Sequence, residues 1–548
     1  MLFCVKLARI ALILLTALGL ALPGQALARA NSQRRPHCSG AGVPQVALSP
    51  LNGAPAVPPG AQISFLGVPA SALHEISVVG SRSGVHPGAL HAYATAQGAS
   101  FLPRSGFTAG ERVEVHATVR FGGGCRTIAS AFTVARPAQP VYEEPLEYPG
   151  TPGEMQHFES NEVKPPVLTV TQPAGAESAP GYLFATPYLG PGEHGPMIFE
   201  SSGRLVWFHL LPPGLDAADF APQSYEGQQA LVWWQGSVNT LGFGLGEDVV
   251  MNDAYKVVAK IHAGNGLRAD MHAIELTANG TAAILDAYEP VRIGAAAAEG
   301  QRSAPGAPSR VVLDGVVQEI DVKTGLVMWE WDSLGHVAFS ASRQPPPKRR
   351  SKPFDYFHLD DVQSLSGGQL RVFARNAATV YTLNGRTGAV ISRLREKEGV
   401  SRSTLGEGDS QTLSNGNELV YAPGANGFAE FDAAGNRVYE AQFPAGEASE
   451  RVLREPWDGE PSGGPGIATK AAGTQTKVSV SWNGATDVST WEVLSGLSPT
   501  SLSPVGTLSS SGFETSFSIP AEPYVEVIAL DADGEILGES KIKEAVHE

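Results

Sequence analysis

The pattern of apolar and polar residues is most regular between Lys352 and Gly388, where three short apolar runs are separated by turn residues. The first run follows His358 and ends at a Ser-Gly-Gly turn, Ser366–Gly368. The third run, VYTL, ends at a tight Asn384–Gly385 turn. Because such turns connect neighbouring antiparallel strands, the pattern predicts one small antiparallel sheet.

The second run, QLRVFAR, alternates in polarity and is predicted to be a strand. Successive side chains of a strand point to opposite faces, so Arg371, Phe373 and Arg375 are predicted to share one face. The apolar residues between them would share the other face. The connecting turn brings His358 and Arg375 to the same end of the sheet. A neutral imidazole beside a guanidinium suits chemistry on an anion such as a sulfate or phosphate ester.

This unit is repeated further along the chain. DVQSLSGGQL from Asp361 is followed 48 residues later by DSQTLSNGNEL from Asp409, and Asn384 recurs as Asp432 at the same spacing. A period in the high forties with several short strands per repeat is typical of a β-propeller blade. A solenoid of strands is the alternative. The propeller is favoured because the repeats are long and their insertions are irregular.

Composition supports an all-β chain of several domains. The 548 residues correspond to about three or four domains. Glycine (62) and proline (41) are abundant, which favours many turns over long helices. The net charge of −16 argues against a nucleic-acid partner, which would require a basic surface. An anionic substrate must therefore be attracted by local cations.

Residues 1–30 have the pattern of a signal peptide. Two basic residues precede the apolar run Ile10–Leu22, and small residues fit cleavage near Ala28 or Ala30. The run is too short for a comfortable membrane span, and the sequence has no second long apolar segment. We therefore expect a secreted or cell-envelope protein with no integral membrane segment after cleavage.

The rest of the chain divides by composition into four parts. Residues 31–136 contain short strands without the repeat and predict an Ig-like β-sandwich. Residues 137–166 are rich in proline and acidic residues and predict a semi-rigid linker. Residues 167–460 hold the repeats and predict a β-propeller of five to six blades. Residues 461–548 predict a fibronectin type III-like sandwich with tryptophan in its core.

Two cysteines, Cys38 and Cys125, remain once the predicted signal peptide is removed. An even pair in an exported chain predicts one disulfide, which would tie the first strand of the N-terminal sandwich to one of its last strands. No His-Glu-x-x-His spacing and no phosphate-binding Gly-x-x-x-x-Gly-Lys loop occurs in the sequence. The sequence therefore predicts no metal site and no bound cofactor.

An ordered series of sequence blocks carries a family resemblance. The blocks include FESNEVKPPVLTV, APGYLFATPYLG, HAGNGLRADMHAIEL, VVLDGVVQEIDVKTGLVMWEWDSLGHV, KPFDYFHLDDV and FARNAATVYTLNGRTGAV. Over residues 158–458 they resemble the bacterial aryl-sulfate sulfotransferase family. The resemblance implies a six-bladed propeller with its active site in the central channel. There a histidine would take a sulfuryl group from an aryl sulfate and pass it to a phenol, with no nucleotide cofactor.

The same resemblance assigns candidate catalytic residues. The family's Asp-x-His element falls on Asp270–His272, its Tyr-Phe-His element on Tyr356–His358, and its Ala-Arg-Asn element on Ala374–Asn376. His272, His358 and Arg375 are therefore expected to line one anionic site. Without the resemblance, a purely structural role would be the simpler interpretation of each of these histidines.

One element of the family pattern is missing. The family's nucleophile lies in a Gln-His-Asp element in the blade after the arginine, but this chain has no histidine between His358 and His547. That blade is therefore predicted to be deleted. Two hypotheses stay open: an exported arylsulfotransferase that uses a retained histidine, or a catalytically inactive propeller that acts as an extracellular or cell-envelope binding protein. The three retained elements favour the first, and the missing element favours the second.

Overall fold

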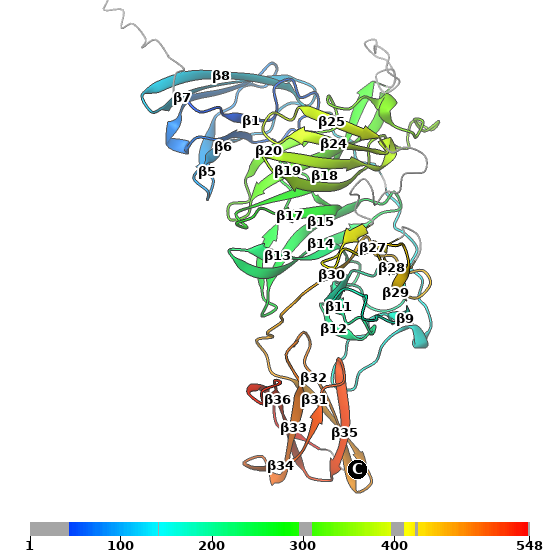
Figure 1. The fold of residues 1–548 in the computed structure, drawn as a ribbon. Coiled ribbons are helices and arrows are strands. Elements are labelled where there is room, and N and C mark those ends of the chain that lie inside the picture. Colours follow the sequence, from blue (N-terminus) through cyan, green and yellow to red (C-terminus); the bar gives the residue numbers. More distant parts are fainter. Residues whose placement is uncertain (1–42, 141, 295–308, 396–409, 422–425, 546–548) are drawn as a thin grey trace, which may run out of the picture.

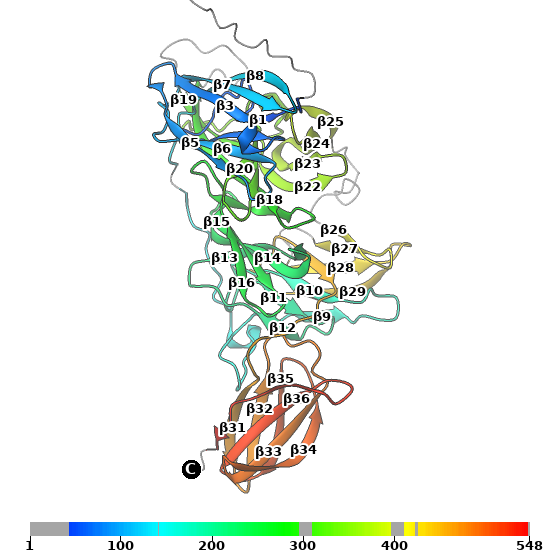
Figure 2. The ribbon, with the colours of Figure 1, turned by 90° about the vertical axis from the view of Figure 1, so that its left-hand side faces the viewer.

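The computed structural model describes residues 43–140, 142–294, 309–395, 410–421 and 426–545. The chain is all-β, and three parts follow one another along its long axis, with the N-terminal sheets at one end and the C-terminal sheets at the other (Figures 1 and 2). The helices among the described residues are single 3₁₀ turns: η1 (Ala70–Ala72), η2 (Pro152–Glu154), η3 (Phe339–Ala341) and η4 (Arg375–Ala377). No described helix has the length and apolar character needed to cross a membrane.

Two of the sequence-based predictions concern residues that lie wholly or partly outside these ranges. The predicted signal peptide, 1–30, and Cys38 are not described, whereas Cys125 lies near the start of a strand. Export and the Cys38–Cys125 disulfide therefore stay predictions.

The N-terminal part consists of two four-stranded antiparallel sheets that enclose one apolar core. The first sheet has the order β1 (Ala47–Ser49), β2 (Ile63–Leu66), β6 (Gly98–Pro103), β5 (Gly88–Ala92). The second has the order β4 (Gly84–Val85), β3 (Leu73–Gly80), β7 (Arg112–Phe121), β8 (Gly124–Thr133). The hydroxyls of Tyr93 and Ser100 donate to the Val327 carbonyl at 3.1 and 3.0 Å, which fixes this part on the central region.

The C-terminal part also has two sheets around an apolar core. One contains β31 (Gly466–Ala472), β32 (Gln475–Ser481) and β35 (Glu514–Pro520). The other contains β34 (Ser501–Ser509), β33 (Thr490–Ser498), β36 (Tyr524–Leu530), β37 (Ile536–Glu539) and β38 (Lys543–Glu544). Trp491 is 2% exposed within this core, and Trp482 packs against its edge.

The central region is propeller-like, and its described strands form four sheets. The largest sheet has nine strands, narrows to the single pairing of Gly246 with Ala269 and so divides into two groups, which gives five strand groups. The first contains β12 (Leu205–Phe208), β11 (Met197–Phe199), β10 (Tyr182–Ala185) and β30 (Val452–Glu455). The second contains β13 (Asp216–Tyr225), β14 (Gln228–Val238), β15 (Gly244–Asn252) and β16 (Val257–Ile261). The third contains β17 (Ala269–Leu276), β18 (Ala282–Gly294), β19 (Ser309–Asp321), β20 (Val327–Asp332) and β21 (Phe354–Asp355). The fourth contains β22 (Leu359–Leu365), β23 (Gln369–Ala374), β24 (Thr379–Asn384) and β25 (Val390–Arg395). The fifth contains β26 (Ser410–Thr412), β27 (Glu418–Tyr421), β28 (Gly427–Phe431), β29 (Arg437–Gln442) and β9 (Thr169–Gln172).

The central strand β14 is buried on both faces because it packs between two apolar clusters. In β14, Trp234 packs in one apolar cluster and Trp233 in the next, and both side chains are fully buried. This explains why β14 has a continuous apolar run, ALVWW, in place of a polar–apolar alternation.

The two ends of the central region close the ring. The late strand β30 pairs with the early strand β10, with Phe184 opposite Leu453. The early strand β9 pairs with the late strand β29, with Val170 opposite Ala441. First and last segments therefore complete each other's sheets.

The predicted three-stranded unit is confirmed as β22, β23 and β24, and the turn between the first two uses Gly367 and Gly368 in the left-handed region, with φ of +76° and +71°. One detail was wrong. The strand ends at Ala374, and Arg375 begins the 3₁₀ turn η4, so Arg375 does not continue the face of Arg371 and Phe373.

The segment 137–166 is more than a spacer. Its backbone pairs with the central region, where Ala138 N donates to Pro290 O at 2.7 Å and Thr240 N donates to Glu143 O at 2.9 Å. Tyr142 packs between these contacts against Phe243. The first half of the predicted linker therefore lies on the central region.

Ring closure depends on a buried ion pair. Arg454 on β30 lies 3.6 Å from Glu430 on β28, both side chains are fully buried, and the guanidinium lies 4.7 Å from the ring centre of Tyr439. We expect Arg454→Met to lower the free energy of unfolding by about 3–5 kcal/mol in a urea titration, because it leaves a buried carboxylate without its cation.

The exposed pair of Arg437 and Glu440 on β29 supplies the control. Arg437→Met should change stability by less than about 1 kcal/mol. The double variant Arg454→Met/Glu430→Gln should recover part of the loss. Equal effects of the two single variants would contradict the assignment of Arg454 to ring closure.

Candidate active site

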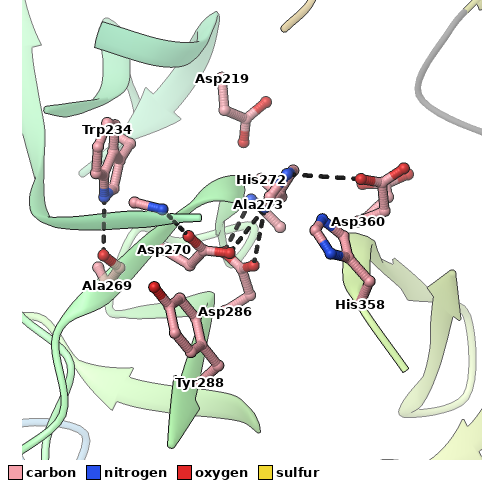
Figure 3. A network of polar contacts seen from close by, with 12 residues as sticks. Asp219, Trp234, Ala269, Asp270, His272, Ala273, Asp286, Tyr288, His358 and Asp360 are labelled. Atoms are coloured by element: carbon pink, nitrogen blue, oxygen red, sulfur yellow. Dashed lines mark hydrogen bonds and ion pairs between the residues drawn. The ribbon is translucent and has the colours of Figure 1, made fainter. Parts of the chain in front are cut away.

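The structure brings together the three residues that the sequence singled out. His272 lies on β17, His358 directly precedes β22, and Arg375 directly follows β23. The ring centres of the two histidines are 5.4 Å apart. His272 and Arg375 both contact the carboxylate of Asp360, and Figure 3 shows His358 beside the same carboxylate.

His358 is held in an unusual backbone conformation. Its φ of +50° lies in the left-handed region, which is uncommon for a residue other than glycine and is frequent at functional sites. Its carbonyl accepts a hydrogen bond from Arg375 N at 2.9 Å, which locks the ends of β22 and β23 together. The strand pairing thereby fixes the distance between the two candidate residues.

The imidazole of His358 is held in place through only one of its two ring nitrogens. Nδ1 contacts Asp355 Oδ2 at 2.5 Å, and Asn376 Nδ2 donates to the same oxygen at 2.8 Å. The histidine side chain is 3% exposed, and its Nε2 has no hydrogen-bond partner among the described residues. A buried nitrogen with a free lone pair is available for chemistry.

His272 is surrounded by carboxylates. Nδ1 contacts Asp270 at 2.7 Å, and Nε2 lies 3.5 Å from Asp360 and 3.6 Å from Glu450. Complete burial by itself would lower the pKa of His272, but these carboxylates raise the pKa to about 10. The ring is therefore an imidazolium at neutral pH, fixed in the centre of the network shown in Figure 3.

Arg375 completes the cluster of charges. Its Nη2 contacts Asp360 Oδ1 and lies 3.4 Å from Glu450 Oε1. Burial acts to lower the pKa of Arg375, and the two carboxylates raise it. Burial acts to raise the pKa of Asp360, but the cations of His272 and Arg375 lower it, so this carboxyl is ionised.

The space in front of these groups is kept open by Gly242. A Cβ atom at this position would lie 3.7 Å from Arg375 Nη1 and 3.9 Å from His358 Nε2. Both atoms therefore face one small volume. Gly242 also has a φ of +80°, which a side chain would disfavour.

An aromatic wall borders this volume. The ring of Phe243 lies 4.4 Å from that of His358 and 4.0 Å from that of Tyr288, measured between centres. Tyr142, from the predicted linker, packs in the same cluster. The cluster is a buried apolar core that packs directly beside the histidine.

Sequence reasoning missed several members of the site. Asp360 sits in the HLDD motif directly after His358, and that position was a usable signal. Glu450 and Tyr142 carry no local signal, because only the closed ring and the packed linker bring them to the centre. Phe243 follows the glycine turn at Gly242, which has no repeat pattern.

Comparison with known families agrees with this geometry. Residues 221–408 match the arylsulfotransferase (ASST) family, a range that includes His272, His358 and Arg375. The match assigns this segment of the chain to the arylsulfotransferase family. A comparison with curated proteins finds no match for the chain.

Several solved structures are distantly similar to the chain. A Bacteroides caccae protein of unknown function has 11% identity and a TM-score of 0.25, covering 55% of this chain and 82% of its own. The dihydro-heme d1 dehydrogenase NirN has 12% identity and a TM-score of 0.20, covering 72% of each chain. A quinonprotein alcohol dehydrogenase-like protein from Bacteroides thetaiotaomicron has 8% identity and a TM-score of 0.17, covering 90% of this chain and 95% of its own. Similarity at these TM-scores carries no argument about function.

The family match ends at residue 408, within residues 396–409, which lie outside the described part of the chain. The deletion of the Gln-His-Asp element therefore stays a prediction from the sequence.

The charge on His272 makes stability depend on pH. Its pKa of about 10 in the folded protein exceeds the value of 6.5 expected when the chain is unfolded. This stabilisation is complete below pH 6.5 and is lost as the pH rises towards 10. Relative to wild type, His272→Gln should therefore flatten the fall in unfolding free energy between pH 7 and 10. Urea titrations across this range test the expectation, and parallel curves for the two proteins would contradict it.

Proposed function

We propose that the chain transfers a sulfuryl group from an aryl sulfate to a phenol, without a nucleotide cofactor, and that His358 carries the group between them. The observation that supports this role is the state of the imidazole. Asp355 holds Nδ1, whereas the buried Nε2 has no partner among the described residues and faces the same small volume as Arg375 Nη1. This is the arrangement of an activated nitrogen nucleophile.

The reaction would proceed in two displacements. In the first, Nε2 of His358 attacks sulfur, the N–S bond forms, and the bond from sulfur to the aryl oxygen breaks with its electrons going to oxygen. The leaving phenolate takes the proton of the His272 imidazolium. In the second, an acceptor phenol returns a proton to His272 while its oxygen attacks sulfur, and the N–S electron pair returns to Nε2.

The pKa of His272 suits this proton transfer. Its value of about 10 lies close to that of a phenol, also about 10. Proton exchange between the imidazolium and a phenolate is therefore nearly balanced in free energy, which is favourable for a group that must both give and take a proton.

Arg375 would stabilise the negative charge on the sulfuryl oxygens. Its Nη2 stays on Asp360, whereas Nη1 points towards the volume at Gly242 and can donate to an oxygen there.

The proposal also covers the number of blades, the two flanking domains and the export of the chain. Division of the nine-stranded sheet at the pairing of Gly246 with Ala269 supports a propeller of five blades, in line with the predicted loss of one blade. We assign the N-terminal two-sheet part as an Ig-like sandwich and the C-terminal part as a fibronectin type III-like sandwich. The signal-peptide pattern in residues 1–30 supports export to the envelope or the medium.

Replacement of His358 tests the nucleophile. With a chromogenic aryl sulfate and a phenol acceptor, His358→Asn should reduce transfer by about 10³-fold or more, because covalent catalysis is lost. Wild type incubated with donor alone should carry one sulfuryl group on the peptide that contains His358, detected by mass spectrometry.

His262→Ala provides the control, since its side chain is 65% exposed and pairs with Glu247 outside the site. It should retain full transfer. Wild type with no turnover on any aryl sulfate would instead favour an inactive binding protein. A sulfuryl group found on another residue would remove His358 from the role of carrier.

Two replacements of Arg375 test its role in sulfuryl transfer. Arg375→Ala should lower kcat/KM by about 10²–10³-fold, the usual cost of removing one donor to a developing anion. Arg375→Lys keeps the charge beside Asp360 but cannot offer one nitrogen to the carboxylate and another to the sulfuryl group, so activity should recover only in part. Equal activity of the alanine and lysine variants would show that paired donors are not required.

A further inference from the structure

The same cluster contains three side chains with atoms suited to bind one metal ion. His272, His358 and Asp360 each offer one ligand atom, and these atoms all lie within 4.8 Å of one another. His272 Nε2 is already 3.5 Å from Asp360 Oδ1. Two ligands on one zinc ion are separated by about 3.4 Å, given bonds of about 2.1 Å in tetrahedral geometry.

The two imidazole rings are also oriented as the rings of metal-binding histidines usually are. A ligating histidine usually gives its second ring nitrogen to a carboxylate, which fixes the ring and its basicity. Here Asp270 holds Nδ1 of His272 at 2.7 Å, and Asp355 holds Nδ1 of His358 at 2.5 Å. Nε2 of His358 is buried without a partner among the described residues. Nε2 of His272 lies beside Asp360 and Glu450, and it would release its proton on binding a metal.

We infer that His272, His358 and Asp360 form a binding site for one divalent transition-metal ion with the ligand preferences of Zn²⁺. Two imidazoles and one carboxylate are a known ligand set for zinc and leave a further coordination position open.

The charges around the three ligands favour a dication. Carboxylates of Asp270, Asp355 and Glu450 lie around the two histidines and Arg375. In the structure Arg375 occupies the side of Asp360 that the metal would use. Its guanidinium already reaches Glu450 at 3.4 Å and its side chain is 33% exposed, so it has a partner and room to move aside.

This site has a consequence for transfer, and that consequence alone rests on the proposed function. The lone pair that binds the metal is the one that would attack sulfur, so metal and sulfuryl group exclude each other on His358. We expect Zn²⁺ to inhibit transfer and a chelator to restore it.

The test is metal binding by the full mature chain after removal of metal with a chelator. Isothermal titration with Zn²⁺ should give one tight site, and Co²⁺ should give the visible absorption of a low-symmetry, four-coordinate centre. His358→Gln and Asp360→Asn should each weaken Zn²⁺ binding by more than about 100-fold, and Asp355→Asn by about 10–100-fold. Circular dichroism and the unfolding midpoint confirm that each variant is folded.

Two controls separate this site from others. His262→Ala removes an exposed histidine and should leave the affinity unchanged. Asp286→Asn tests the neighbouring group of Asp270, His272 and Asp286, which also has ligand atoms within 4.8 Å of one another. If Asp286→Asn abolishes binding while His358→Gln does not, the metal lies on the other side of His272 and the inference is overturned.

The absence of a tight zinc site in wild type would likewise overturn it. Transfer without zinc binding would leave the proposed function intact, whereas zinc binding without transfer on any aryl sulfate would count against the function and not against the metal site. The two claims are therefore tested independently.

Discussion

The structure depends on the pairing of charges that are buried or partly buried. In the centre of the strand ring, His272 lies between Asp270 and Asp360, and Arg375 joins Asp360 to Glu450. A buried charge without its partner costs several kcal/mol, so these groups must arrive together. They come from the third and fourth strand groups and from the segment before β30. Correct assembly of the ring and correct assembly of the site are consequently one event.

Arg451, the residue after Glu450, is also a partly buried charge that needs charged partners. Its guanidinium contacts Asp219 on β13 at 2.7 Å and Asp361 on β22 at 3.3 Å. Burial raises the pKa of Asp361 to about 6, although Arg451 opposes that rise. One arginine from the closing segment thus bridges two strand groups far apart in sequence. The polar centre specifies which strands meet, in addition to what they can bind.

Local structure could be predicted from the sequence because its causes are local. The hairpin of β22 and β23 follows from a glycine turn and alternating residues, and the similar turns at Asn384 and Asp432 follow from side-chain oxygens that accept nearby backbone N–H groups. The family resemblance supplied His272, His358 and Arg375. The predicted strand position of Arg375 was wrong because the chain turns into η4 to let its backbone N–H reach His358. Glu450 and Tyr142 could not be predicted, since only ring closure and linker packing bring them to the site.

The reciprocal pairing of β9 with β29 and β30 with β10 bears on the order of events during biogenesis. Tyr182 lies opposite Glu455, so an early strand waits for a partner that is synthesised more than two hundred residues later. Contacts of such long sequence separation form slowly. The edge of β10 stays unprotected until the last strand arrives, and an exposed edge can recruit other chains. A truncated chain that ends before β30 should therefore be prone to aggregate through the free edge of β10.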